Sequence, residues 1–190
     1  MTETIHLKYL KDIIPKDGLE LLRSQLGEHG IGFEWHDISD EPQASVEELL
    51  APIILFLSSD LVQAYFLGLA TSASYDVIKS TVLDLWQHIS GKKIKKITPS
   101  DVEEVDANFD LDVNTSGKIR VKFKLKGNIP DSLKKTCVDK AFQLLESKCF
   151  PEIRTGYVCI YNVDREQWEI FEDLEFVKKY VIPKDGKKFV

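Results

Sequence analysis

The sequence predicts an α+β protein, and three observations carry this prediction. Some short segments alternate apolar with polar residues, others repeat apolar residues at helical spacing, and the two kinds are interleaved along 190 residues. With 43% hydrophobic and 29% charged residues, the chain has enough core to fold without disulfides or a metal. We expect an N-terminal β-α-β-(α)-β-α-α portion at residues 1–92 and a C-terminal β-β-α-β-β portion at residues 97–190, forming either two units or one continuous domain.

In the N-terminal portion, period-two alternation marks the strands and 3.6-residue spacing marks the helices. Pro15 signals a helix start and Gly27 a helix end, while Ser45 with Glu48 indicates one short turn of helix. Pro52 ends that turn. The strands are predicted at residues 4–10, 31–36 and 53–57, and the longer helices at 15–27, 60–70 and 75–90.

The C-terminal portion is expected to open with an antiparallel hairpin at residues 105–126, followed by a helix, two strands and a final segment. Pro130 and Asp131 start the helix, whose inner side includes Cys137. The strands are predicted at residues 157–161 and 167–171, and residues 172–180 form either a short helix or an extended tail.

The charges of the hairpin resemble a nucleic-acid surface, because basic residues alternate along its second strand. The first strand carries acidic residues in the matching positions, and apolar residues are odd-numbered in both strands, so cross-strand partners must sum to an even number. With Thr115-Ser116-Gly117 as the turn, we expect Asp112 opposite Arg120, Asp106 opposite Lys126 and Phe109 opposite Phe123. The resulting exposed ion pairs neutralise the basic stripe.

The net charge of −6 also disfavours nucleic acid as a partner. A membrane span at residues 51–70 is disfavoured because Ser58, Ser59 and Asp60 interrupt it. Three cysteines, without C-x-x-C spacing or a secretion signal, favour a cytoplasmic location. Cys149, at a predicted helix end, is the most reachable of these thiols.

Motifs for catalysis or cofactor binding are absent from the sequence, so we expect neither a cofactor nor a metal. The run Asp110-x-Asp112-x-Asn114 matches the opening of a calcium loop, but Val121 stands where the bidentate glutamate is needed. His36 shares a strand face with Glu34, an arrangement more often fortuitous than catalytic. Whether the chain is an enzyme stays open, with the balance against it.

Two hypotheses for function remain. The helix at 60–70 is apolar nearly all round, which indicates a non-catalytic protein-interaction or self-associating module, with a homodimer expected. Its interaction surface would include Tyr65, Phe66 and Leu69, and Leu61 and Val62 are among the apolar residues that one sheet face cannot all cover. The alternative is a small enzyme acting on an anionic or phosphorylated molecule at the junction of Ser58, Ser59 and Asp60, where a buried strand leads into a helix N-terminus.

Overall fold

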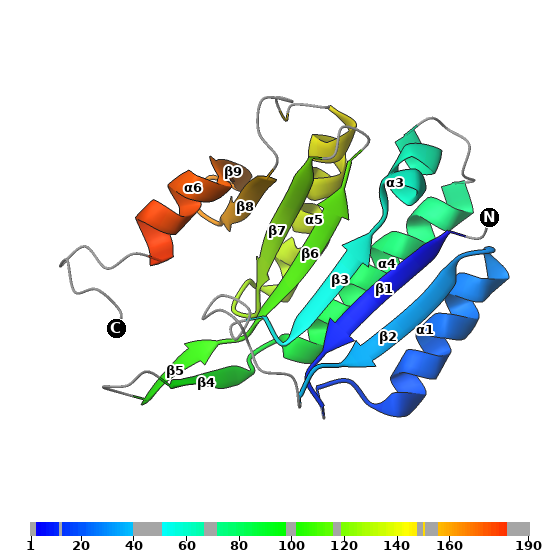
Figure 1. Ribbon diagram of the computed structural model, residues 1–190, viewed down its shortest axis with the longest axis horizontal. Coiled ribbons are helices and arrows are strands. Elements are labelled where there is room, and N and C mark those ends of the chain that lie inside the picture. Colours follow the sequence, from blue (N-terminus) through cyan, green and yellow to red (C-terminus); the bar gives the residue numbers. More distant parts are fainter. Residues whose placement is uncertain are drawn as a thin grey trace.

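The computed structural model describes residues 3–11, 13–39, 51–66, 72–97, 102–115, 119–147, 150 and 156–181, and of 63–66, 72–73, 95–97, 102–103 and 181 the backbone alone. The elements confirm an α+β fold (Figure 1). The strands are β1 (Thr4–Tyr9), β2 (Gly32–Asp37), β3 (Ile53–Leu57), β4 (Lys93–Ile97), β5 (Val102–Asp106), β6 (Asn108–Asn114), β7 (Arg120–Lys126), β8 (Gly156–Asn162) and β9 (Gln167–Glu172). The helices are α1 (Lys16–Glu28), α3 (Ser59–Phe66), α4 (Ser72–Ile89), α5 (Asp131–Glu146) and α6 (Asp173–Phe176), which continues into a π-helical turn, η1 (Val177–Val181).

Seven strands form one mixed sheet in the order β2-β1-β3-β6-β7-β8-β9. Neighbours are parallel in the pairs β1–β2, β3–β6 and β7–β8 and antiparallel in the other three pairs. Because β3 pairs with β6, strands from both halves of the sequence share this sheet. The strands β4 and β5 form a separate two-stranded sheet.

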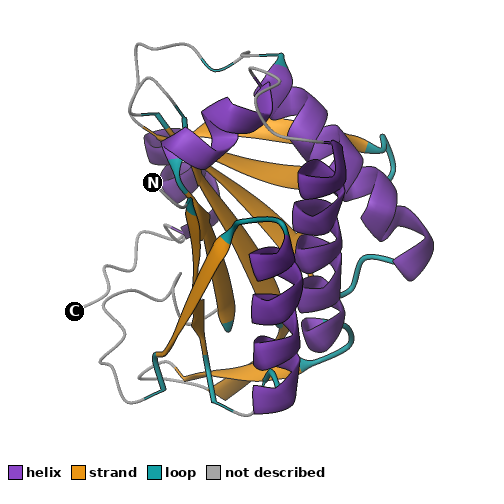
Figure 2. Cartoon of the chain, turned by 90° about the vertical axis from the view of Figure 1, so that its right-hand side faces the viewer, coloured by secondary structure: helices purple, strands orange, loops and turns teal. Residues whose placement is uncertain are grey.

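The helices α1, α4 and α5 cover one face of the seven-stranded sheet, as the edge-on view in Figure 2 shows. Each supplies an apolar stripe at helical spacing, such as Leu19, Leu22 and Leu26 on α1. Trp86 of α4 is fully buried between helix and sheet, and its indole N–H donates to the carbonyl oxygen of Lys126 at 3.0 Å. The opposite face of the sheet carries α6, which packs on β8 and β9 (Figure 1).

Most predicted elements coincide with observed ones. The strand at residues 53–57 and the helix that begins at Asp131 are found at their predicted positions, and residues 173–181 are helical rather than extended. Gly91 follows α4 with a φ of 68°, the left-handed conformation that ends helices. The predicted turn of helix at 45–48 lies outside the described residues. No helix among the described ranges combines the length and apolar content needed to cross a bilayer.

The prediction of one continuous strand from residue 105 to 113 is wrong, because the chain changes partners at Ala107. The amide of Ala107 donates to the carbonyl of Lys92 at 2.9 Å, and its carbonyl accepts from the amide of Gly127 at 2.9 Å. Asp106 therefore lies opposite Lys93 in the small sheet rather than opposite Lys126. The apolar alternation runs unbroken through this point, so it gives no sign of the change.

The predicted register of the β6–β7 hairpin is also wrong, by two residues. Phe109 pairs with Leu125 and Phe123 with Leu111, so cross-strand partners sum to 234 rather than 232. The amide of Thr115 donates to the carbonyl of Ile119 at 2.8 Å, and the predicted turn residues between them lie outside the described residues. A slip of two residues keeps every side chain on its face, so parity alone cannot decide between these registers.

Candidate functional site

The predicted anion site at the start of α3 shows the hydrogen bonds of a capped helix. The Ser58 hydroxyl oxygen accepts from the amide of Leu61 at 3.2 Å, and the hydroxyl donates to the Glu3 carboxylate at 3.3 Å. The Ser59 hydroxyl donates to Asp60 at 3.4 Å. A carboxylate of the chain itself thus lies beside this helix N-terminus, where it competes with any external anion. Anion binding here stays a prediction.

Most of the predicted interaction surface on α3 lies outside the described residues. Tyr65 and Phe66 belong to the helix, but their side chains are outside the described part of the chain, as is Leu69 entirely. Leu61 and Val62, which the same hypothesis used, are buried in the chain's own core at 2% and 6% exposure. Part of the apolar excess of this helix is therefore covered within one chain, and the homodimer stays a prediction.

Residues suited to catalysis are dispersed over the described structure. His6 on β1 contacts Glu34 on β2 at 3.3 Å, with both side chains more than half exposed. Burial raises the pKa of the Cys137 thiol to about 11, so this thiol is a poor nucleophile near neutral pH. Within the described ranges, no group of three or more His, Cys, Asp or Glu side chains is arranged to hold a metal ion. Cys149 lies outside these ranges.

The most unusual feature of the structure is a charged cluster on the sheet face opposite α1, α4 and α5, which we call the open face. Its side chains alternate with the core residues of β1, β3, β6 and β7. The sequence predicts that the polar side of the hairpin is exposed, and this is wrong for Asp110, Asp112 and Lys124. The open face includes the side chains of His6, Lys8, Phe56, Asp110, Asp112, Arg120, Lys122, Lys124 and Lys126.

Two carboxylates of this cluster are almost completely removed from water. Asp110 and Asp112 are 1% and 2% exposed, and Lys124 is 7% exposed. Arg120 donates its Nε–H to both oxygens of Asp112, at 2.8 and 2.9 Å, and its Nη2 to one of them. Lys124 donates to the Asp110 carboxylate at 3.2 and 3.4 Å. Buried carboxylates need such charge-assisted bonds, because their desolvation otherwise costs several kcal/mol, of the order of 3–5.

The α6–η1 segment helps to desolvate this cluster. The ring of Phe176 lies 5.8 Å from Nζ of Lys124. Tyr180 packs edge-on against Phe171 of β9, with the ring centroids 5.6 Å apart, and Nζ of Lys179 lies 4.5 Å from the Phe171 ring. A segment some fifty residues away in sequence therefore covers polar side chains of β7, which the local pattern cannot reveal.

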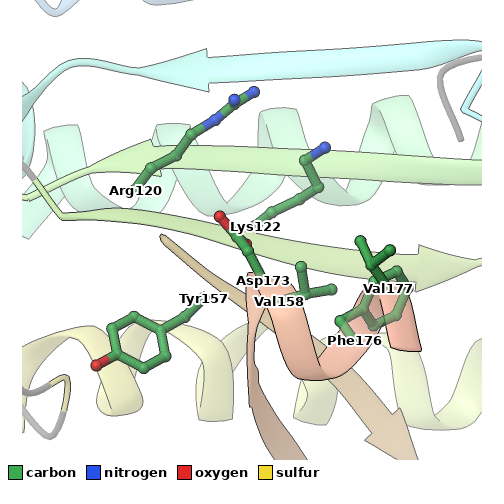
Figure 3. A pocket seen from close by; sticks show the side chains of 7 residues that line it. All are labelled: Arg120, Lys122, Tyr157, Val158, Asp173, Phe176 and Val177. Carbon is green, nitrogen blue, oxygen red and sulfur yellow. The ribbon is translucent and has the colours of Figure 1, made fainter. Parts of the chain in front are cut away.

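A pocket of about 260 Å³ opens between β7, β8 and the α6–η1 segment (Figure 3). Two cationic side chains and one carboxylate line it together with an apolar wall. Its lining residues are Arg120, Lys122, Tyr157, Val158, Asp173, Phe176 and Val177. Such a volume is just below the range typical of sites for drug-sized molecules, so the pocket suits a single side chain or a small fragment.

Comparison with known proteins gives no information about this site, so its function is inferred from its own geometry. No protein-family model, curated protein or solved structure matches the chain. The sequence does contain one signal for this site, since Arg120, Lys122 and Lys124 present three cations at alternate positions against only two carboxylates, Asp110 and Asp112. On its own, the same pattern predicts a neutralised, solvated face, and the burial of Asp110 and Asp112 shows that this face is not fully solvated.

Proposed function

We propose that the chain is a non-catalytic protein-interaction module that binds an acidic segment of a partner protein across its open face. The observation that carries this proposal is the layering of the sheet. Three helices cover one face (Figure 2), whereas α6 and η1 lie at the β8–β9 end of the described part of the other face (Figure 1). The side chains left there combine cations with aromatic rings, which can contact an acidic group and an apolar group of a partner together.

Charge identifies the kind of partner. The whole chain carries a net charge of −6, yet the exposed cations of the open face include Lys8, Arg120 and Lys126. The acidic groups of the hairpin on this face, Asp110 and Asp112, are buried and ion-paired, so they contribute little attraction for external cations. An acidic segment is therefore attracted to a locally basic surface on an acidic protein.

The interleaved apolar rings favour a peptide over nucleic acid. Nζ of Lys8 lies 5.9 Å from the centre of the Phe56 ring, so a cation and an aromatic surface adjoin at one place. A peptide that alternates acidic and apolar side chains matches both features. Nucleic-acid binding instead requires a continuous basic surface, which the exposed Glu34 carboxylate beside His6 interrupts.

The proposal includes a cytosolic location for the protein. Self-association through α3 is the alternative to binding a partner through the open face. Cys137 and Cys159 are free and buried, as suits a reducing compartment. A homodimer built on Tyr65, Phe66 and Leu69 of the α3 region would use a different surface from the open face.

Fluorescence anisotropy with an acidic peptide tests the proposal. The probe is a twelve-residue peptide that alternates Glu with Leu, and its control carries Gln in place of Glu. We expect the acidic peptide to bind at least about tenfold more tightly than the Gln peptide, with affinity that falls as salt rises. Lys8→Glu and Lys126→Glu should each weaken binding, whereas Lys135→Glu on the exposed side of α5 should leave it within about twofold.

Three results would reject the proposal. The first is equal binding of the two peptides, and the second is equal loss in Lys8→Glu and Lys135→Glu. The third is tighter binding of single-stranded DNA of the same charge, which would make the open face a nucleic-acid surface. A homodimer by analytical ultracentrifugation that binds neither peptide would replace the proposal with self-association.

A further inference from the structure

Lys122 has a longer contact with its acidic partner than Arg120 and Lys124 have with theirs. Its Nζ lies 3.8 Å from Oδ2 of Asp110, the same oxygen that Lys124 contacts at 3.2 Å. Only 19% of its side-chain surface is exposed. An ammonium group that is largely removed from water and loosely paired gains more from an additional anion than a fully solvated lysine does.

The pocket that Lys122 lines also has an apolar wall. Val158, Phe176 and Val177 lie on the β8 and α6–η1 side of the pocket, whereas the side chains of Lys122 and Arg120 extend from β7 across β6, toward Asp110 and Asp112 (Figure 3). Val158 and Phe176 are 4% and 5% exposed, so their packing holds the wall in place. A ligand that fills this space therefore needs a negative group and an apolar group close together.

The chain already supplies one carboxylate to this pocket. Asp173, the first residue of α6, lines it. The pKa of the Arg120 guanidinium is raised mainly by its hydrogen bonds to Asp112, and the charge of Asp173 adds to this effect. An ideal Cβ on Gly156 would lie 1.8 Å from Oδ2 of Asp173, so the absence of a side chain at Gly156 allows the Asp173 carboxylate to lie there. The pocket thus accommodates a carboxylate near Arg120, and Asp173 opposes the entry of a second one.

From this geometry we infer that the pocket binds a carboxylate with an adjacent apolar group, supplied by a Glu or Asp beside an apolar residue of the partner segment. The inference rests on the proposed function for the source of that carboxylate. Lys122 pairs with the carboxylate, and Val158, Phe176 and Val177 receive the apolar group. The pocket therefore fixes one residue of the partner segment, while the rest of that segment makes less specific electrostatic contacts with the open face.

Two-dimensional NMR of the full chain, titrated with 3-phenylpropanoate, tests the pocket. The matched control ligand is 3-phenylpropanamide, which has the same shape without the charge. We expect shifts around Lys122, Val158 and Val177, with the amide bound at least about tenfold more weakly. This comparison uses the unaltered chain, so it does not depend on the folding of any variant.

Three substitutions sharpen the test. Lys122→Gln should weaken the acid about tenfold, and Lys126→Gln, on the same strand but outside the pocket, should change it by less than about twofold. Asp173→Asn should tighten binding several-fold, because it removes the competing charge. Equal binding of acid and amide, shifts elsewhere on the chain, or an unchanged affinity in Lys122→Gln would overturn the inference.

The two proposals fail in different ways. If the acidic peptide binds but 3-phenylpropanoate neither binds nor displaces it, the pocket is rejected and the open face is retained. If 3-phenylpropanoate binds through Lys122 while the acidic peptide does not bind, a partner protein is rejected as the source of the carboxylate. Displacement of the peptide by 3-phenylpropanoate, lost in Lys122→Gln, supports both.

Discussion

Arg120 binds the carboxylate of Asp112 diagonally across the β6–β7 hairpin rather than from the position directly opposite. The residue opposite Asp112 is Lys122, and the residue opposite Arg120 is Asn114. The guanidinium reaches over one pair of the ladder to donate from Nε and Nη2. Lys122, although it lies opposite Asp112, instead contacts Asp110, with its Nζ 3.8 Å from Oδ2.

Removing Arg120 should therefore destabilise the fold. Arg120→Ala leaves the Asp112 carboxylate buried without its bidentate donor, which for a fully buried pair costs about 3–5 kcal/mol. The Arg120 side chain is 52% exposed, so water screens part of this loss and we expect about 2 kcal/mol in the free energy of unfolding. Urea denaturation measures it.

The control for this prediction is Arg165→Ala in the exposed β8–β9 turn, expected within about 0.5 kcal/mol of the unaltered chain. If Arg120→Ala is as stable as Arg165→Ala, the buried Asp112 does not depend on the guanidinium. The double variant Arg120→Ala, Asp112→Ala should lose less stability than the sum of the single variants, since it leaves no unpaired carboxylate.

The hairpin register can be checked directly in solution. Cross-strand NMR contacts should join Phe123 with Leu111 and Phe109 with Leu125. The register with Phe123 opposite Phe109 would bring the two rings together instead. Strong contacts between these rings, with none between Phe123 and Leu111, would restore the register expected from the turn residues.

Local sequence patterns predict which face of a strand is buried, but they do not predict which residues of the neighbouring strand it pairs with. Alternation along Val121, Phe123 and Leu125 correctly predicted which side of β7 enters the core, because a buried face requires apolar residues at every second position. The same alternation could not fix the register, since a slip of two residues conserves it. Nor could it reveal the partner change at Ala107, which depends on Lys92 and Gly127, both remote in sequence.

The candidate site was harder to predict for a related reason. Lys124 and Asp110 have the pattern of a solvated strand face, and their burial depends on Phe176 and the rest of the C-terminal helical segment. The charge imbalance on β7 was visible in the sequence. Its meaning depended on burial, which no local pattern encodes.

Two glycine-to-alanine substitutions should change stability in opposite directions. A Cβ on Gly127 would lie 2.7 Å from the Ala107 carbonyl oxygen and 2.8 Å from that of Ile89, and both are backbone atoms held by hydrogen bonds. Gly127→Ala should therefore cost about 1–3 kcal/mol, like other overpacked sites. At Gly27 near the end of α1, a Cβ meets nothing within 4 Å.

Gly27→Ala should accordingly stabilise the chain, by about 0.5–1 kcal/mol, because alanine loses less backbone entropy in a helix than glycine. Thermal unfolding of the two variants beside the unaltered chain measures both effects. Equal melting temperatures for the two variants would contradict the close backbone approach at Gly127.

The stability of the chain should fall in alkaline solution because two buried groups resist ionisation. Burial raises the pKa of Cys137 from 9.0 to about 11 and that of Tyr161 from 10.0 to about 12. Between pH 9 and 11 the unfolded chain releases the Cys137 proton while the folded chain retains it. The unfolded state then binds fewer protons, so the free energy of unfolding decreases as pH rises.

Each of the two groups should contribute a slope of at most about 1.4 kcal/mol per pH unit, with the Cys137 contribution between pH 9 and 11 and the Tyr161 contribution between pH 10 and 12. Urea denaturation in steps from pH 7 to 10.5 measures the slope. Cys137→Ala should flatten the curve between pH 9 and 10, although its small cavity lowers stability at every pH. The slope below pH 8 should be the same in both proteins and serves as the control, whereas an equally steep fall in Cys137→Ala would assign the alkaline sensitivity to other groups.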